Sequence, residues 1–150
     1  MLNVGIVGLG TIGKVVAKAL DDGMDELQLS SIASGRREKA EAFLATLNTP
    51  IEIMSIEEVA ESCEIVVDCA PKVVFAEIAN ATISQGKILV TVSGAGILAN
   101  PDIEKQAAKK KARVILATGA LLGLDAVRAA AEGTINSVKM VTRKPPNALQ

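Results

Sequence analysis

Three glycines near the N-terminus form the pattern that most clearly indicates a binding function. Gly8, Gly10 and Gly13 fit the pattern GxGxxG, in which Thr11 and Ile12 precede the last glycine. Where this pattern follows a strand and opens a helix, the first glycine permits a tight turn and the second lets a pyrophosphate approach the backbone. The third lets the helix pack on the strand, and the N–H groups of the helix N-terminus bind the phosphates. We therefore predict that these five residues bind a dinucleotide; the alternative is a glycine-rich turn without a ligand.

The end of the second predicted strand bears on which dinucleotide is bound. The stretch Ser34-Gly35-Arg36-Arg37 contains no acidic residue. An acid at this place binds the ribose 2′-OH of NAD, whereas an arginine suits the 2′-phosphate of NADP because a guanidinium donates two hydrogen bonds. We therefore predict that Ser34, Arg36 and Arg37 contact the cofactor. We predict that the cofactor is NADP, or that both NADP and NAD are used, rather than NAD alone. The alternative is that both arginines are merely solvated at the start of the next helix.

Small residues follow three further predicted strands. In open α/β sheets ligands bind beyond the carboxyl ends of the strands, and small residues there let a flat nicotinamide ring lie against the backbone. The predicted contacts in these loops are Cys69, Ala70, Ser93, Gly94, Ala95, Gly119 and Ala120. Any one of these loops could instead be only a tight turn, and Asp68 could be a helix-capping carboxylate.

The elements that position these loops alternate along the chain. Short apolar runs alternate with longer segments of helical periodicity, which is typical of βαβ units. The strands read as continuous apolar runs, so both faces of the sheet are expected to be covered. We predict an α/β fold, a Rossmann-type doubly wound parallel sheet in the order 3-2-1-4-5-6. Its strands are expected at residues 4–7, 29–33, 51–54, 65–68, 87–92 and 113–117.

Several residues mark the expected helix ends. Ser55 and Glu58 have the spacing of a capping box. Pro71 is expected at the first position of a helix that Gly86 terminates, and Asn100 with Pro101 is expected to cap the next one. A last helix is predicted at residues 124–132, followed by Gly133.

The C-terminal residues have a different pattern. Apolar and polar residues largely alternate over 138–143, which predicts a strand of another, half-exposed sheet. We therefore expect a dinucleotide-binding domain at residues 1–133. Residues 134–150 would begin a second α+β domain, so the chain is expected to be a fragment or a truncated protein.

Composition excludes several classes of function. The 150 residues carry 16 basic and 17 acidic side chains, a balance that predicts no nucleic-acid partner and no membrane surface. Because histidine is absent, the chain has no histidine base, ligand or Ser-His-Asp triad, and we predict no catalytic residue and no metal site in it. The two cysteines do not form a CxxC motif and indicate reduced thiols in a cytoplasmic protein.

Four stretches together resemble the L-aspartate dehydrogenase family. The most specific are residues 119–126, GALLGLDA, and 141–146, VTRKPP; residues 8–14, GLGTIGK, and 67–70, VDCA, fit as well. The resemblance covers the whole chain. Family members usually read Gly-Ala-Ile-Gly in the first stretch, where this chain has Leu122, and Glu-Cys-Ala where it has Asp68-Cys69-Ala70. By this comparison, Leu122 is expected to narrow the space beside the nicotinamide.

The resemblance implies NAD(P)-dependent oxidative deamination of L-aspartate, through iminoaspartate, to oxaloacetate and ammonia, with a link to NAD biosynthesis. It implies that Ala120 contacts the cofactor. The family's catalytic histidine and a cofactor-contacting asparagine lie in a following substrate domain and have no counterpart in this sequence. We therefore expect the 150 residues alone to be inactive, and the whole protein to be a homo-oligomer with a small-molecule substrate.

Two other interpretations remain open. A related amino-acid-pathway reductase, similar to dihydrodipicolinate reductase or homoserine dehydrogenase, would share the fold and the glycine pattern. A non-catalytic dinucleotide-binding or assembly domain is compatible with the missing histidine.

Overall fold

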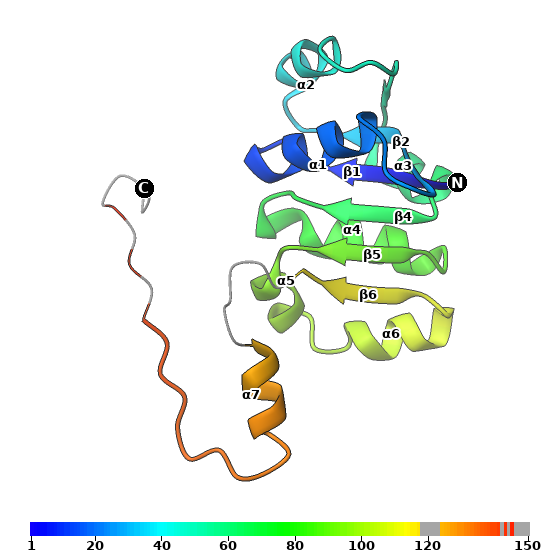
Figure 1. Cartoon of the computed structure of the whole chain (residues 1–150). Helices are drawn as coiled ribbons and strands as arrows, with labels where there is room; N and C mark the ends of the chain where they lie inside the picture. The colour runs from blue at the N-terminus through cyan, green and yellow to red at the C-terminus, as the bar shows by residue number, and fades with distance from the viewer. Residues whose placement is uncertain (118–123, 142, 144, 146–150) are drawn as a thin grey trace. The chain divides into compact units, whose positions relative to one another are not determined.

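The computed structural model describes residues 1–117, 124–141, 143 and 145. The chain divides into two compact units, Met1–Ala117 and Thr118–Gln150. The first unit is built on six parallel strands in the order β3-β2-β1-β4-β5-β6, which confirms the predicted topology (Figure 1). The strands are β1 (Leu2–Val7), β2 (Leu27–Ala33), β3 (Glu52–Ile53), β4 (Ile65–Asp68), β5 (Ile88–Thr91) and β6 (Arg113–Leu116).

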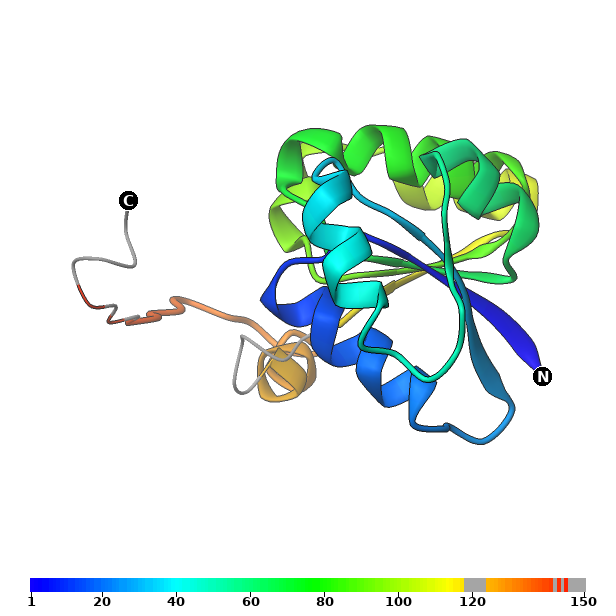
Figure 2. The same ribbon diagram turned by 90° about the horizontal axis from the view of Figure 1, so that it is seen from above.

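Helices cover both faces of this sheet. The helices are α1 (Thr11–Asp21), α2 (Arg37–Leu44), α3 (Ile56–Ser62), α4 (Phe75–Ser84), α5 (Gly94–Ala99) and α6 (Ile103–Lys110). One core packs Ile6 and Ile32 against Ala17 of α1, and the other packs Val66 and Leu89 against α3, α4 and α6 (Figure 2). Neighbouring residues of β1, β2 and β4 therefore enter opposite cores, which explains why these strands read as continuous apolar runs.

The helix ends were predicted only in part. The capping box is present: Ser55 Oγ accepts the Glu58 N–H, and the Glu58 carboxylate accepts the Ser55 N–H. Gly86 follows α4 with a φ of 69°, as its position after a helix requires. The expectation for Pro71 is wrong because this residue is extended and precedes a 3₁₀ turn, Lys72–Val74, so that α4 begins only at Phe75.

The helix expected after Asn100 and Pro101 is also placed differently. A short helix that the sequence did not predict, α5, comes first, and Ser93 Oγ caps it by accepting the Gly96 N–H at 3.2 Å. The next helix, α6, begins at Ile103 with Asp102 at its N-cap. This helix was missed because the run Gly94-Ala95-Gly96 is typical of a turn, and its capping hydrogen bond cannot be predicted from the sequence.

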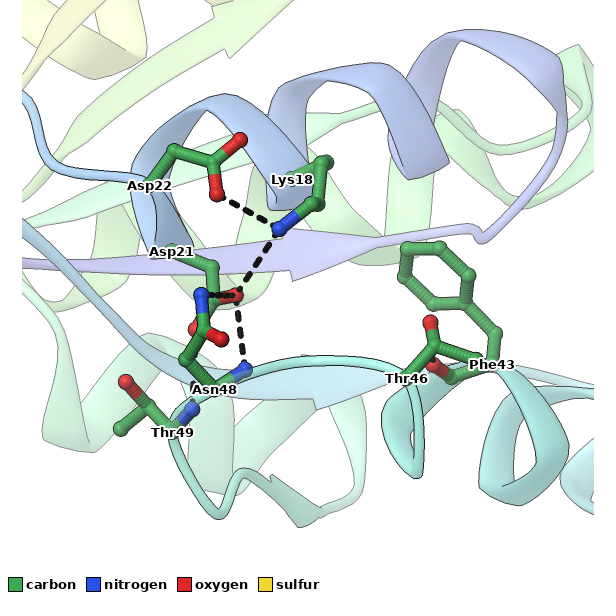
Figure 3. Close-up of polar contacts among 7 residues, drawn as sticks. All are labelled: Lys18, Asp21, Asp22, Phe43, Thr46, Asn48 and Thr49. Carbon is green, nitrogen blue, oxygen red and sulfur yellow. Dashed lines mark hydrogen bonds and ion pairs between the residues drawn. The ribbon is translucent and has the colours of Figure 1, made fainter.

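A carboxylate at the C-terminal end of α1 connects this helix to the segment after α2. Asp21 accepts hydrogen bonds from the backbone N–H groups of Asn48 and Thr49, at 2.8 and 2.9 Å, and from the Asn48 side chain at 3.0 Å (Figure 3). Lys18 lies 3.6 Å away, and none of the Asp21 side-chain surface is exposed. The backbone bonds lower the pKa of this carboxyl below its ordinary value. We call this group of four residues the Asp21 cluster.

The second unit contains helix α7 (Leu124–Ala130), which ends two residues before the predicted bound. The strand expected over 138–143 is wrong for the residues that the structure describes, since 134–141, 143 and 145 are neither helix nor strand. A strand needs a hydrogen-bonded neighbour, and the alternating pattern alone does not supply one. In the described part of the chain, no helix is long and apolar enough to cross a membrane.

Candidate functional site

The glycine loop after β1 has the geometry that its pattern requires. Gly8 has a φ of 96°, and a Cβ there would lie 2.7 Å from the backbone nitrogen of Ala70. A Cβ on Gly13 would collide with the carbonyl oxygen of Gly8. Both positions therefore exclude side chains for reasons internal to the fold. Gly10 is different because a Cβ there would meet no atom within 4 Å. The space beside Gly10 is free for a ligand, which fits a pyrophosphate.

The N-terminus of α1 faces this space with unpaired donors. Gly10 is the N-cap residue and cannot supply a side chain, and no other described side chain caps the helix. The N–H groups of the first turn have no partner within a helix. Thr11 and Ile12 are exposed at this turn, whereas Gly13 is buried against the loop. The arrangement can bind an anion through backbone N–H groups and the helix dipole.

The end of β2 carries two arginines in different environments. Ser34 Oγ accepts the backbone N–H of Arg36 at 3.3 Å, which shapes the turn. The Arg37 guanidinium points along α2 and pairs with Glu41 at 2.9 Å. Arg36 is exposed and forms no ion pair with any residue that the structure describes. Of the two predicted contacts, Arg36 is therefore the guanidinium that can bind a phosphate without first leaving a partner.

The ends of β4 and β5 are joined by a buried hydrogen-bond chain. Thr91 Oγ1 donates to the Asp68 carboxylate at 2.6 Å, and the Ala70 N–H donates to the same carboxylate at 3.1 Å. Thr91 Oγ1 also accepts the N–H of Ser93 at 2.9 Å. The loop residues Ala70 and Ser93 are thus held by one carboxylate and one hydroxyl, both of which are buried.

Cys69 lies in the same corner but its thiol is not activated. Burial raises the pKa of the Cys69 thiol to about 11, and the neighbouring charge of Asp68 contributes to the shift. The thiol therefore remains protonated at neutral pH. The two cysteines are free. Among the described residues, no cluster of histidine, cysteine or acidic side chains could hold a metal ion.

The topology brings most of the predicted site residues to one edge. Val7 pairs with Asp68 and Asp68 with Thr91, so the loops after β1, β4 and β5 follow directly from adjacent strand ends. Ser34 and the arginines follow β2, on the other side of β1. Gly94 and Ala95 open α5 after Ser93, and a Cβ at Gly94 would meet nothing within 4 Å. Gly119 and Ala120 lie outside the described residues.

Sequence reasoning missed the connection between Asp68 and Thr91. An acid at the end of an apolar strand was visible, but its side chain could equally have capped a helix. Only the register of β4 and β5, which sets Asp68 directly opposite Thr91, shows that the carboxylate joins two loops.

The segment that carries these loops matches a known family of domains. The family described as "Homoserine dehydrogenase, NAD binding domain" matches residues 8–117, which run from the first glycine of the loop to the end of the first unit. The chain belongs to this family of NAD-binding domains. The predicted cofactor class, NAD or NADP, is therefore confirmed, since the matched segment includes the glycine loop, the arginines and the joined ends of β4 and β5.

Curated relatives of this NAD-binding domain are named L-aspartate dehydrogenases. The one from Bradyrhizobium diazoefficiens is 46% identical over 99% of this chain and 53% of its own length. L-aspartate dehydrogenase 3 from Bordetella bronchiseptica is 38% identical over 97% of this chain and 54% of its own length. The resemblance stated from the sequence is confirmed. The chain spans about half the length of these relatives.

Solved structures support the fold of the domain. A probable dehydrogenase from Thermotoga maritima matches with a TM-score of 0.71 and 18% identity, over 87% of this chain and 41% of the other. At this identity the likeness shows the fold alone, and it confirms the Rossmann-type prediction.

Proposed function

We propose that this chain is the cofactor-binding part of an enzyme that oxidatively deaminates L-aspartate to iminoaspartate, which hydrolyses to oxaloacetate and ammonia. The observation that carries the proposal is the 46% identity to the Bradyrhizobium L-aspartate dehydrogenase over 99% of the chain. The matched segment includes the loops at the carboxyl edge of the sheet as well as the buried strands.

The bound dinucleotide would accept a hydride from the substrate. The chain's own residues bind and orient it: the N–H groups at Gly10, Thr11 and Ile12 bind the pyrophosphate, and Arg36 binds a 2′-phosphate. The small residues after β4 and β5 leave room for the flat ring; these are Cys69, Ala70, Ser93, Gly94 and Ala95. We also propose that Gly119 and, by resemblance, Ala120 contact the cofactor.

Proton transfer is expected to depend on residues outside this chain. Oxidation of an amine needs a group that takes a proton near neutral pH, and histidine is the usual one. The chain has no histidine. We therefore expect the 150 residues to bind cofactor without useful turnover. We further propose a cytoplasmic enzyme that assembles from identical subunits, which light scattering of the complete protein would test.

Substrate oxidation is the decisive test. The complete product of the reading frame that encodes this chain is assayed by nicotinamide absorbance with L-aspartate and NAD⁺ or NADP⁺, and in reverse with oxaloacetate and ammonia. The 150-residue chain is tested in parallel for cofactor binding and turnover. We expect aspartate-dependent reduction by the complete product and binding alone by the chain. Turnover by the chain at ordinary enzyme rates would contradict the assignment of proton transfer elsewhere.

A homoserine dehydrogenase-like activity is the second candidate, because the matching family carries that description. L-homoserine is the matched control substrate in the same assay. Reduction of the cofactor with L-homoserine and none with L-aspartate would replace the first proposal by this one.

A further inference from the structure

Asp68 is a buried acidic residue without a charged partner among the residues that the structure describes. Its residue surface is 1% exposed. The two groups that bind its carboxylate, the Thr91 hydroxyl and the Ala70 N–H, are both neutral. None of the ion pairs among the described residues includes Asp68. Removing a carboxylate from water is costly unless an opposite charge compensates it, so its retention needs an explanation.

The two oxygens of Asp68 accept from different donors: one accepts the Ala70 N–H and the other accepts the Thr91 hydroxyl. A carboxylate supplies both acceptors, whereas an amide of the same shape offers only one oxygen. The carboxylate also brings a negative charge, and neither of its two donors carries a positive one. Buried charges of this kind concentrate at functional sites.

The position of Asp68 indicates what its charge acts on. It is the last residue of β4, directly opposite Val7 of β1, the residue before the glycine loop. Its other neighbour in the sheet, Thr91, precedes the small-residue loop after β5. These strand ends form the edge at which a nicotinamide ring would lie in an open α/β sheet. Burial is the main cause of the raised pKa of the Cys69 thiol, and the neighbouring charge of Asp68 adds to it.

We propose that Asp68 favours the oxidised cofactor through the attraction between its buried carboxylate and the positively charged nicotinamide ring, which is neutral in the reduced form. This inference rests on the proposed function, because it needs the nicotinamide at the ends of β4 and β5. Asp68 does not touch the ring in this account. It acts across the loop backbone, and low-dielectric surroundings make its field effective.

The test compares ratios of dissociation constants rather than activity. NAD⁺ and NADH, and separately NADP⁺ and NADPH, are titrated against the 150-residue chain by calorimetry and nicotinamide fluorescence. Within each pair the cofactors differ at the ring alone. In Asp68→Asn we expect the affinity for the oxidised form to fall by roughly three- to ten-fold relative to the reduced form.

Two matched variants separate charge from structure. Asp68→Glu keeps the carboxylate and should keep the native ratio. Thr91→Val removes the hydroxyl from both of its hydrogen bonds but leaves the charge, so it should leave the ratio unchanged or shift it toward the oxidised form. This second expectation stands even if Asp68→Asn does not fold.

Two results would overturn the inference: an unchanged ratio in folded Asp68→Asn, with or without an equal loss of affinity for both forms, or a Thr91→Val ratio that moves toward the reduced form. If the unmodified chain binds none of the four dinucleotides, the proposed function itself fails. Binding with a ratio insensitive to Asp68 would leave the proposed function intact and remove only this inference.

Discussion

Asp21 and Asp68 are both withdrawn from water, but they lie in opposite surroundings. Asp21 accepts three N–H bonds from Asn48 and Thr49 and lies near Lys18, so its charge is compensated within the chain. Asp68 has two neutral donors and no ion-pair partner among the described residues. Because α1 runs back across the sheet, Asp21 lies at the edge where strands begin and Asp68 at the edge where they end (Figures 1 and 3).

The two edges of the sheet are expected to contribute differently, one to the stability of the fold and the other to cofactor binding. At the beginning of the strands, the Asp21 cluster connects α1 to the segment after α2 and completes its own charge balance. At the ends of the strands, three groups have unmet capacity among the described residues: the first N–H groups of α1 have no side-chain acceptor, and Arg36 and Asp68 have no ion-pair partner. Substitutions at the first edge should change folding, and those at the second edge should change binding.

The largest expected effect is at Gly10. Gly10→Val should abolish dinucleotide binding, because the added side chain would occupy the free space that a pyrophosphate needs. The melting temperature should stay near that of the unmodified chain, since a Cβ at this position meets no atom within 4 Å. Calorimetric titration and thermal unfolding measure the two quantities. Native affinity in a folded variant would place the phosphates elsewhere.

A smaller, selective effect is expected at the arginines. Arg36→Ala should weaken NADP(H) by about ten-fold or more and spare NAD(H), because a hydrogen bond to a charged group contributes roughly 1.5–3 kcal/mol. Arg37→Ala is the matched control and should weaken NADP(H) less, as Arg37 is already paired with Glu41. Titration of both dinucleotides against both variants gives the comparison. Unchanged NADP(H) affinity in Arg36→Ala would remove the assignment of the phosphate contact.

The smallest effect, and the one confined to stability, is expected at Asp21. Asp21→Asn should lower the melting temperature by a few degrees at neutral pH and leave cofactor affinity unchanged. The backbone N–H groups of Asn48 and Thr49, with Lys18, hold the pKa of this carboxyl below its ordinary value of 3.8. Ionised Asp21 therefore stabilises the fold above that value, and the stabilisation is lost as the pH falls through the lower folded-state pKa.

Thermal unfolding at several pH values checks this sign. The gap in melting temperature between the native chain and Asp21→Asn should be constant near neutral pH and close in acid. Asp25→Asn, the same substitution at an exposed acid outside the helices and outside the ion pairs of the described residues, is a suitable control and should show no comparable gap. A gap that widens on acidification would contradict the role given to the Asp21 carboxylate.

Features that depend on residues close together in the chain could be predicted from the sequence. The glycine spacing, the continuous apolar strands and the capping box of Ser55 with Glu58 depend on residues a few positions apart, so the sheet order and the tight glycine loop after β1 could be predicted. Arg36 and Arg37 were predicted together for the same reason. Nothing local distinguished them until the pairing of Arg37 with Glu41 was visible.

Tertiary structure decided the features whose partners are far apart in the chain. Asp68 meets Thr91 across 23 residues, and Asp21 meets Asn48 across 27. The predicted strand over 138–143 was wrong for the described residues. An alternating pattern of apolar and polar residues indicates which face of a strand could be buried, but not whether a neighbouring strand exists. The sequence by itself therefore determined the fold and the cofactor class. Only the packed sheet decided that Asp21 joins α1 to the segment after α2 and that Asp68 joins the loops after β4 and β5, because hydrogen-bond partners brought together by tertiary packing are not encoded by local spacing.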